Sequence, residues 1–180
     1  RPKSSAASDV YKRQGIIQFG LLDKAILSLN AHNIEYSVYA DVVADPPESV
    51  VMDAVATAQV FECDAVIGFG GGSSMDVAKL LAVLINGEQS LSEIYGVDQV
   101  TGGRLPLIQV PTTAGTGSEA TMVSIITTGE TTKAGVVSRT LLADKIILDA
   151  SLTKVFQRMS QQLRELTPWC MPSKLTPQNV

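Results

Sequence analysis

Histidine, cysteine and aromatic residues are scarce in this chain of 180 residues. The only histidine is His32, so the chain alone cannot build a metal site with several histidine ligands. The two cysteines, Cys63 and Cys170, cannot form a disulfide framework or a four-ligand zinc site. Aromatic residues make up 5% of the chain, so we expect a core of aliphatic side chains.

Long apolar runs and an excess of positive charge are also absent. No run approaches the roughly 18 apolar residues of a membrane span. The formal net charge of -4 gives no reason to expect nucleic acid as a partner. With 45% hydrophobic and 18% charged residues, the chain suits one soluble globular domain. We therefore expect no membrane or nucleic-acid partner and a cytoplasmic location.

The two ends of the chain differ in composition from its middle. Residues 1–14 carry a net charge of +3, residues 15–154 carry -9 and residues 155–180 carry +2. All 14 glycines lie in the middle segment, whereas Trp169 and three of the eight prolines lie in the last 13 residues. We interpret residues 15–154 as the folded domain.

The first segment, RPKSSAASDVYKRQ, has basic residues but lacks the apolar stretch of a signal peptide. Residues 4–14 resemble the in-frame translation of a transposase-type DNA-sequencing adapter; the alternative is a disordered terminal tail. We interpret residues 1–14 as a non-native leader. The domain would then be truncated at its start, and its first strand would be missing.

Hydropathy patterns in the middle segment alternate between helical and strand periods. Helices are expected at residues 19–33, after Asp45-Pro46-Pro47, and after a cap at Ser73 or Ser74, with Gly87 ending the last one. Strands are expected at residues 35–40, 64–69, 105–110, 122–127, 133–138 and 145–148. This order predicts a doubly wound, Rossmann-like α/β domain with a parallel sheet.

The loop GFGGGSSMD, residues 68–76, lies between a buried strand and a helix. Its successive glycines, which include Gly71 and Gly72, let backbone N–H groups approach an anion. The helix that begins near Ser73 adds unpaired donors and a partial positive charge. The loop therefore favours a pyrophosphate site, and the alternative is a tight glycine turn with a serine cap.

A second loop, PTTAGTGSEAT at residues 111–121, follows the carboxyl end of a strand, where open α/β sheets bind ligands. Its hydroxyl groups suit phosphate or ribose oxygens, although an ordinary polar loop would read the same way. On the helix after the first loop, Asp76 is interpreted as an acid favoured by the helix dipole. Lys79 is interpreted as its solvated partner on the next turn.

Together and in this order, GFGGGSSMDVAK and PTTAGTGSEAT resemble the nucleotide-binding half of the iron-containing (group III) alcohol dehydrogenases. ADPP at residues 44–47 and ILDASLT at residues 147–153 fit the same family. The resemblance implies a dehydroquinate-synthase-like N-terminal α/β domain and a helical domain that holds a divalent metal. The expected metal is Fe2+. It also implies hydride transfer between NAD or NADP and a small alcohol, aldehyde or ketone, and a homo-oligomer when the protein is intact.

The resemblance further implies that nine residues bind the cofactor: Gly71, Gly72, Ser73, Asp76, Thr112, Thr113, Thr116, Ile125 and Lys133. The glycines and the serine would cradle the pyrophosphate, and the threonines would contact phosphate, ribose or nicotinamide. Ile125 and Lys133 would lie near the ribose and nicotinamide end. Asp76 belongs to the motif without an implied role, and Glu119 is interpreted as structural.

The metal ligands of the family are an aspartate and three histidines, beginning with an Asp-x-x-x-His pair that this chain lacks. After a one-base shift near residues 154–156, the codons of residues 155–180 are compatible with a segment that resembles this pair. We interpret residues 155–180 as a frameshifted tail, His32 as a helix-surface residue, and the chain as an inactive fragment of a metal-dependent dehydrogenase. One alternative is a non-catalytic nucleotide-binding remnant. Another is a relative of glycerol dehydrogenase or dehydroquinate synthase, and the sequence of the second loop argues against this one.

Overall fold

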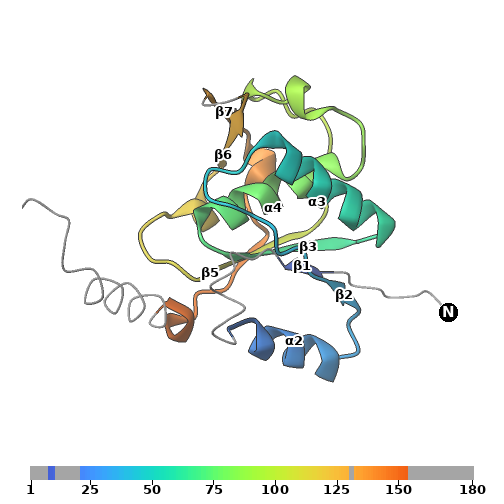
Figure 1. The fold of residues 1–180 in the computed structure, drawn as a ribbon, viewed down its shortest axis with the longest axis vertical. Helices are drawn as coiled ribbons and strands as arrows, with labels where there is room; N and C mark the ends of the chain where they lie inside the picture. The colour runs from blue at the N-terminus through green and yellow to red at the C-terminus, as the bar shows by residue number, and fades with distance from the viewer. Residues whose placement is uncertain (1–7, 11–20, 130–131, 154–180) are drawn as a thin grey trace, which may run out of the picture.

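A computed structural model describes residues 8–10, 21–129 and 132–153 of the chain. The tail at residues 155–180 and most of the proposed leader therefore lie outside the described residues. The described part contains two sheets, with helices on both faces of the larger one (Figure 1).

The larger sheet has five parallel strands in the order β2-β1-β3-β5-β8. Its strands are β1 (Ser8–Val10), β2 (Tyr36–Ser37), β3 (Ala65–Gly70), β5 (Leu107–Pro111) and β8 (Lys145–Ile146). Helices α3 (Glu48–Val60) and α4 (Gly72–Leu84) cover one face, and α2 (Leu21–Ala31) covers the other (Figure 1). This arrangement confirms the predicted doubly wound α/β fold.

The alternation of side chains along β3 explains why helices cover both faces. Val66 packs into the larger core with α3 and α4, whereas Ile67 and Phe69 pack into a smaller core with Leu22 of α2. Gly68 faces α4, and a Cβ atom there would lie 2.9 Å from the Cβ of Ala78. The absence of a side chain therefore lets α4 approach the sheet closely.

A second, smaller sheet has the order β4-β7-β6 and was not expected from the sequence. It contains β4 (Gly96–Val97) and an antiparallel hairpin of β6 (Val123–Thr128) and β7 (Thr132–Val137). The backbone N–H of Thr127 donates to the carbonyl of Pro46 at 2.8 Å, and its hydroxyl donates to the carbonyl of Asp45 at 3.0 Å. The hairpin is thereby fastened to the turn that precedes α3.

Three short 3-10 helices complete the described part: η1 (Leu91–Glu93), η2 (Ser118–Ala120) and η3 (Arg139–Leu141). The segment after η3 is tied to the start of β5 by Arg104, which donates to the Asp144 carboxylate at 2.6 Å and to the carbonyl of Leu142 at 2.6 Å. The same carboxylate accepts from the backbone N–H of Leu107 at 2.8 Å. The Arg104 hydrogen bond, and then that of Leu107, lower the pKa of Asp144 to about 2.

Strand β1 comes from the segment that was interpreted as a leader. Ser8–Val10 lie between β2 and β3 and pair with both, in parallel. These three residues occupy the position between β2 and β3, and the expectation that the native first strand is missing stays a prediction. Strand pairing does not test where the segment comes from, so the leader interpretation stays a prediction.

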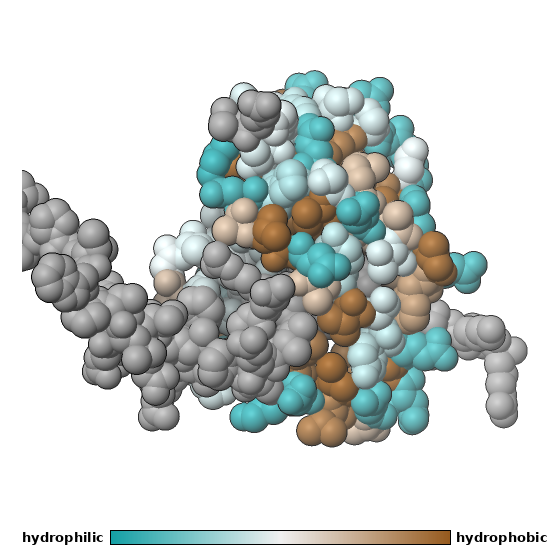
Figure 2. All heavy atoms as spheres, in the orientation of Figure 1, coloured by the Kyte–Doolittle hydropathy of each residue, from teal (hydrophilic) through white to brown (hydrophobic). Residues whose placement is uncertain are grey.

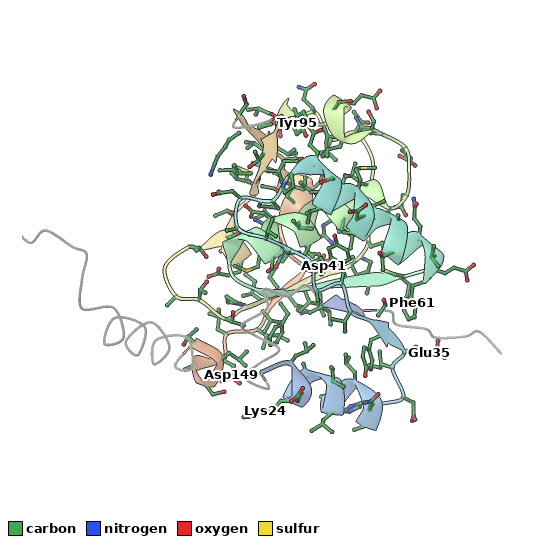
Figure 3. The ribbon with its side chains drawn as sticks, viewed as in Figure 1. Lys24, Glu35, Asp41, Phe61, Tyr95 and Asp149 are labelled. Carbon is green, nitrogen blue, oxygen red and sulfur yellow. The ribbon has the colours of Figure 1, made fainter. Side chains whose placement is uncertain are left out.

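The segment ILDASLT contains the start of a helical turn at residues 150–153. The Asp149 carboxylate accepts the backbone N–H of Ser151 at 2.7 Å, as an N-cap residue does. Hydrogen bonding to Ser151 lowers the pKa of Asp149, and the charge of Lys24 on α2 adds a smaller effect. Figure 3 shows Asp149 and Lys24 on the same side of the molecule, near the N-terminal end of α2.

The described surface is mixed in character, and Figure 2 shows apolar and polar residues side by side on one face. Val60 and Leu148 are 88% and 74% exposed. His32 is exposed, as expected, but it lies in the turn directly after α2 and not in the helix, and its Nδ1 atom lies 2.8 Å from the carbonyl oxygen of Ser28. None of the helices in the described ranges is long and apolar enough to cross a membrane.

Candidate functional site

Strand β3 ends at Gly70 and helix α4 begins at Gly72, so most of the segment that was expected to be the first loop lies in these two elements. The cap residue is Gly71, with extended backbone angles (φ -85°, ψ -173°) and without a side-chain cap bond. The expected cap at Ser73 or Ser74 is therefore wrong, because the extended backbone at Gly71 lets the helix start earlier and takes both serines into its first turn. The first N–H groups of the helix are left without a side-chain acceptor and can receive an anion.

The second loop lies against this helix end. The backbone N–H of Thr112 donates to the carbonyl of Gly70 at 2.9 Å, which fixes the amino end of the loop beside the glycines. A Cβ atom at Gly71 would lie 3.3 Å from Thr113 Oγ1, and one at Gly72 would lie 3.5 Å from Thr116 Cγ2. The two loops thus come together at the start of α4, and the glycines add no side chain to the space between them.

Two hydroxyl groups of the second loop have no hydrogen-bond partner among the residues that the structure describes. Thr112 Oγ1 and Thr113 Oγ1 are buried and form no hydrogen bond within the described part of the chain. Thr112 is fully buried, with 0% of its surface exposed. A buried polar group without a partner costs about 1–3 kcal/mol, so these hydroxyls are suited to a polar ligand that enters beside the glycines.

A cavity of about 430 Å³ lies between α4, the second loop, the β6–β7 hairpin and the turn before α3. Six of the nine predicted cofactor residues line it: Gly72, Ser73, Asp76, Thr116, Ile125 and Lys133. The other three, Gly71, Thr112 and Thr113, lie beside it at the junction of the two loops. The structure therefore gathers all nine residues in one region.

Five residues that line this cavity are not among the nine predicted residues, namely Asp45, Pro46, Ser118, Thr121 and Val123. Lys133 of β7 reaches across to Asp45, with 2.5 Å between Nζ and Oδ1, and both side chains are more than half exposed. The sequence contained a signal for Asp45, since ADPP at residues 44–47 fits the family. The hydropathy pattern gave no sign that the β6–β7 hairpin would lie against the turn before α3.

Lys79 lies in the interior, with 0% of its surface exposed. Its interpretation as a solvated partner is wrong, because η2 and the start of β6 cover this side of α4. Its Nζ atom lies 3.6 Å from the Asp76 carboxylate and 2.8 Å from the carbonyl oxygen of Val123, to which it donates. The flanking sequence VAKLL offered a signal, since apolar residues surround the lysine on both sides.

Burial shifts the pKa of both members of this pair. Removal from water raises the pKa of Asp76, while a hydrogen bond from Ser118 and the charge of Lys79 act in the opposite direction. Removal from water likewise lowers the pKa of Lys79, against the stabilising charge of Asp76. Glu119, interpreted as structural, is half-buried, and its Oε2 atom has no hydrogen-bond partner in the described ranges.

The described residues do not form a metal site. Within residues 8–10, 21–129 and 132–153, no group of three or more His, Cys, Asp or Glu side chains could hold a metal ion. The uncapped start of α4, the glycines beside it and the buried hydroxyls of Thr112 and Thr113 suit an anionic ligand.

Residues 6–150 match the family model of the iron-containing alcohol dehydrogenases. The chain belongs to this family. The match begins inside the segment interpreted as a leader and ends close to the last described residues. Members of the family are oxidoreductases, in agreement with the expected class of enzyme.

Two curated relatives show the extent of the similarity. The chain is 38% identical over 140 residues to the sulfoacetaldehyde reductase of Bilophila wadsworthia, covering 77% of this chain and 36% of that protein. It is 41% identical over 141 residues to long-chain-alcohol dehydrogenase 1 of Geobacillus thermodenitrificans, covering 77% and 35%. The chain thus spans about a third of the length of these iron-containing alcohol dehydrogenase relatives.

Solved structures of the family share the fold. A crystal structure of an iron-containing alcohol dehydrogenase has a TM-score of 0.75 and 34% identity, covering 83% of this chain and 41% of that one. The sulfoacetaldehyde reductase of Bifidobacterium kashiwanohense, solved in complex with NAD+, has a TM-score of 0.70 and 30% identity, covering 82% and 39%. These likenesses confirm the family's Rossmann-like N-terminal domain for this chain.

Proposed function

We propose that the chain binds NAD or NADP at the junction of its two loops, as the dinucleotide-binding part of an alcohol dehydrogenase. The pyrophosphate would lie at the N-terminus of α4, against the backbone of Gly71, Gly72 and Ser73. The observation that carries this proposal is the pair of buried, unpartnered hydroxyls on Thr112 and Thr113 beside a glycine cradle without side chains. A relative with the same fold was solved with NAD+.

The residues of this chain would bind and orient the cofactor. Backbone N–H groups at the start of α4 donate to phosphate oxygens, and the threonine hydroxyls donate to phosphate or ribose oxygens. Ile125 and Lys133 line the cavity on its hairpin side, where the ribose and nicotinamide end would lie. The bound nicotinamide supplies or accepts the hydride when a small alcohol is interconverted with its aldehyde or ketone.

For the whole protein we propose a metal-dependent reaction with Fe2+, in a homo-oligomer located in the cytoplasm. Because the described residues form no cluster of metal ligands, their part in this reaction is to bind and orient the cofactor. We also propose that residues 1–14 are a non-native leader and that residues 155–180 follow a frameshift. Resequencing the source DNA across both ends, from a library made without transposase adapters, tests these two proposals.

A second candidate function is nucleotide binding without turnover. It is favoured by the contrast between a well-formed cradle and the lack of a metal cluster among the described residues. In this case the chain as it stands holds the dinucleotide and transfers no hydride.

One experiment separates these possibilities. The full chain is titrated with NADH and NADPH while cofactor fluorescence is recorded, and turnover is then assayed with 1-propanol and NAD+ in the presence of Fe2+ under anaerobic conditions. We expect saturable binding and no turnover from this chain. Turnover would show that the chain is an active enzyme. A folded chain that binds neither dinucleotide would contradict the proposed function in both forms.

A further inference from the structure

The buried side chain of Lys79 joins α4 to the end of the second loop. Its ammonium group donates to Ser118 Oγ at 3.3 Å, to Thr121 Oγ1 at 3.1 Å and to the carbonyl of Val123 at 2.8 Å. Every proton of the ammonium group therefore has an acceptor. Ser118 and Thr121 belong to the second loop, and Val123 is the first residue of β6.

Asp76 extends this connection by one helical turn. Ser118 Oγ donates to its carboxylate at 2.5 Å, and the backbone N–H of Ile125 donates to the same carboxylate at 3.2 Å. The carboxylate and ammonium groups thus hold one segment, from η2 to the start of β6, from two successive turns of α4. Charged hydrogen bonds of this kind, shielded from water, are stronger than those on the surface.

The loop has little else to fix its shape between its two ends. Its amino end is held by the hydrogen bond from Thr112 to Gly70, and its carboxyl end by Lys79 and Asp76. Residues 114–117 between them are exposed, and a Cβ atom at either Gly115 or Gly117 would meet nothing within 4 Å. The position of Thr113 and Thr116 over the glycine cradle therefore depends on both attachments.

We propose that Lys79 is a positioning residue, which holds the second loop in the shape that receives the dinucleotide. It does not line the cavity itself and acts through Ser118 and Thr121, which do. The expected effect on NADH binding rests on the proposed cofactor function. The expected effect on the conformation of the loop does not, because it is measured in the protein without cofactor.

The test compares the full-length wild type with Lys79→Met, which keeps the length of the side chain and removes its donors. Amide hydrogen exchange of residues 112–121 in the free protein reports the loop, and NADH fluorescence titration reports binding. We expect loop exchange and the NADH dissociation constant each to rise by about ten-fold or more. Thr121→Val serves if Lys79→Met does not fold: it removes one of the three acceptors of Lys79, together with the hydrogen bond that the Thr121 hydroxyl donates to the Ser118 carbonyl at 3.2 Å, and it is expected to change both quantities less.

Ser124→Ala is the matched control. The Ser124 hydroxyl is buried and donates to the backbone carbonyl of Asp76 at 3.0 Å, so it links β6 to the same helix without involving the loop. Its loss is expected to lower the melting temperature and to leave loop exchange and the NADH dissociation constant within about two-fold of the wild type.

The inference is overturned if the folded Lys79 or Thr121 variant shows the loop exchange and NADH affinity of Ser124→Ala. A wild type that binds no NADH would overturn the proposed function, and loop exchange alone would then decide the role of Lys79. Faster loop exchange with unchanged NADH affinity would show that the loop's shape is not what receives the dinucleotide, and would overturn the inference as well.

Discussion

Gly71 lies directly against Thr113, since a Cβ atom added at Gly71 would come within 3.3 Å of Thr113 Oγ1. This contact joins the two motifs at the start of α4 and leaves the backbone of the cradle uncovered. It is the feature of the structure that most closely matches what a pyrophosphate requires.

Gly71→Val is expected to weaken NADH binding by about ten-fold or more, because the new side chain enters the space between the loops. The extended backbone at Gly71 is open to any residue, but the added side chain also presses against Thr113, so the melting temperature should fall as well. Gly103→Ala is the control, since its Cβ atom would meet nothing within 4 Å. Fluorescence titration measures the effect, and equal NADH affinity in both variants would argue against a cradle at this position.

Thr112→Val separates stability from binding. The Thr112 hydroxyl is buried without a partner in the described structure, so its replacement by a methyl group should leave the free energy of unfolding unchanged or raise it. NADH binding should weaken, because the ligand loses a donor. Urea denaturation and NADH titration measure the two effects. A clear loss of stability would show that the hydroxyl has a partner within the protein.

Gly68→Ala is expected to destabilise the fold. The added Cβ atom would lie 2.2 Å from Gln109 Oε1 and 2.9 Å from the Cβ of Ala78, so the side chain of Gln109 and helix α4 must both move. Overpacking of this kind costs about 1–3 kcal/mol of unfolding free energy. Thermal denaturation measures the change against Gly103→Ala, and a melting temperature equal to that of the control would contradict the close approach of α4 to β3.

The pairing of Arg104 with Asp144 predicts a pH dependence of stability. The pKa of Asp144 is about 2 in the folded protein and 3.8 in the absence of its partners. Because the folded pKa is the lower one, the stabilisation is present above about pH 4 and is lost as the pH falls toward 2.

The comparison of Asp144→Asn with the wild type tests this dependence. The wild type should melt at a higher temperature at pH 6, and the difference should shrink steadily below pH 4. The effect is modest, because the Asp144 side chain is 51% exposed and solvent screens its charge. A difference in melting temperature that stays constant from pH 6 to pH 2 would mean that the carboxylate is not held by Arg104.

Much of the larger sheet could be predicted from sequence, because its strands are short apolar runs between turn residues. The apolar run predicted as a strand at residues 64–69 corresponds to β3. Val51, Val55 and Ala58, which were predicted to share one helix face, are buried on α3. Strand β4 has only two residues, both exposed, and so carries no hydropathy signal. Whether the strands at residues 122–127 and 133–138 join the main sheet or form their own depends on contacts with α4 and Pro46, which lie far away in the sequence.

The site residues were inferred from the motifs, and the structure corrects two interpretations made with them, the cap at Ser73 or Ser74 and the exposure of Lys79. Glycine and threonine positions could be identified because their chemistry is local to each loop. The burial of Lys79 could not be derived from its helix alone, since it depends on η2 folding over α4. Asp45 was missed for the same reason, because its contact with Lys133 spans 88 residues of sequence.

Our central claim is that a nicotinamide dinucleotide binds at the start of α4, between the two loops. Titration of the isotope-labelled full chain with NADH, followed by amide chemical shifts, tests it most directly. We expect saturable shifts concentrated at Gly71, Gly72, Ser73, Thr112 and Thr113. Shifts that do not saturate, or that saturate instead around the cavity lined by Asn30, Glu35 and Phe61 near β2, would contradict it.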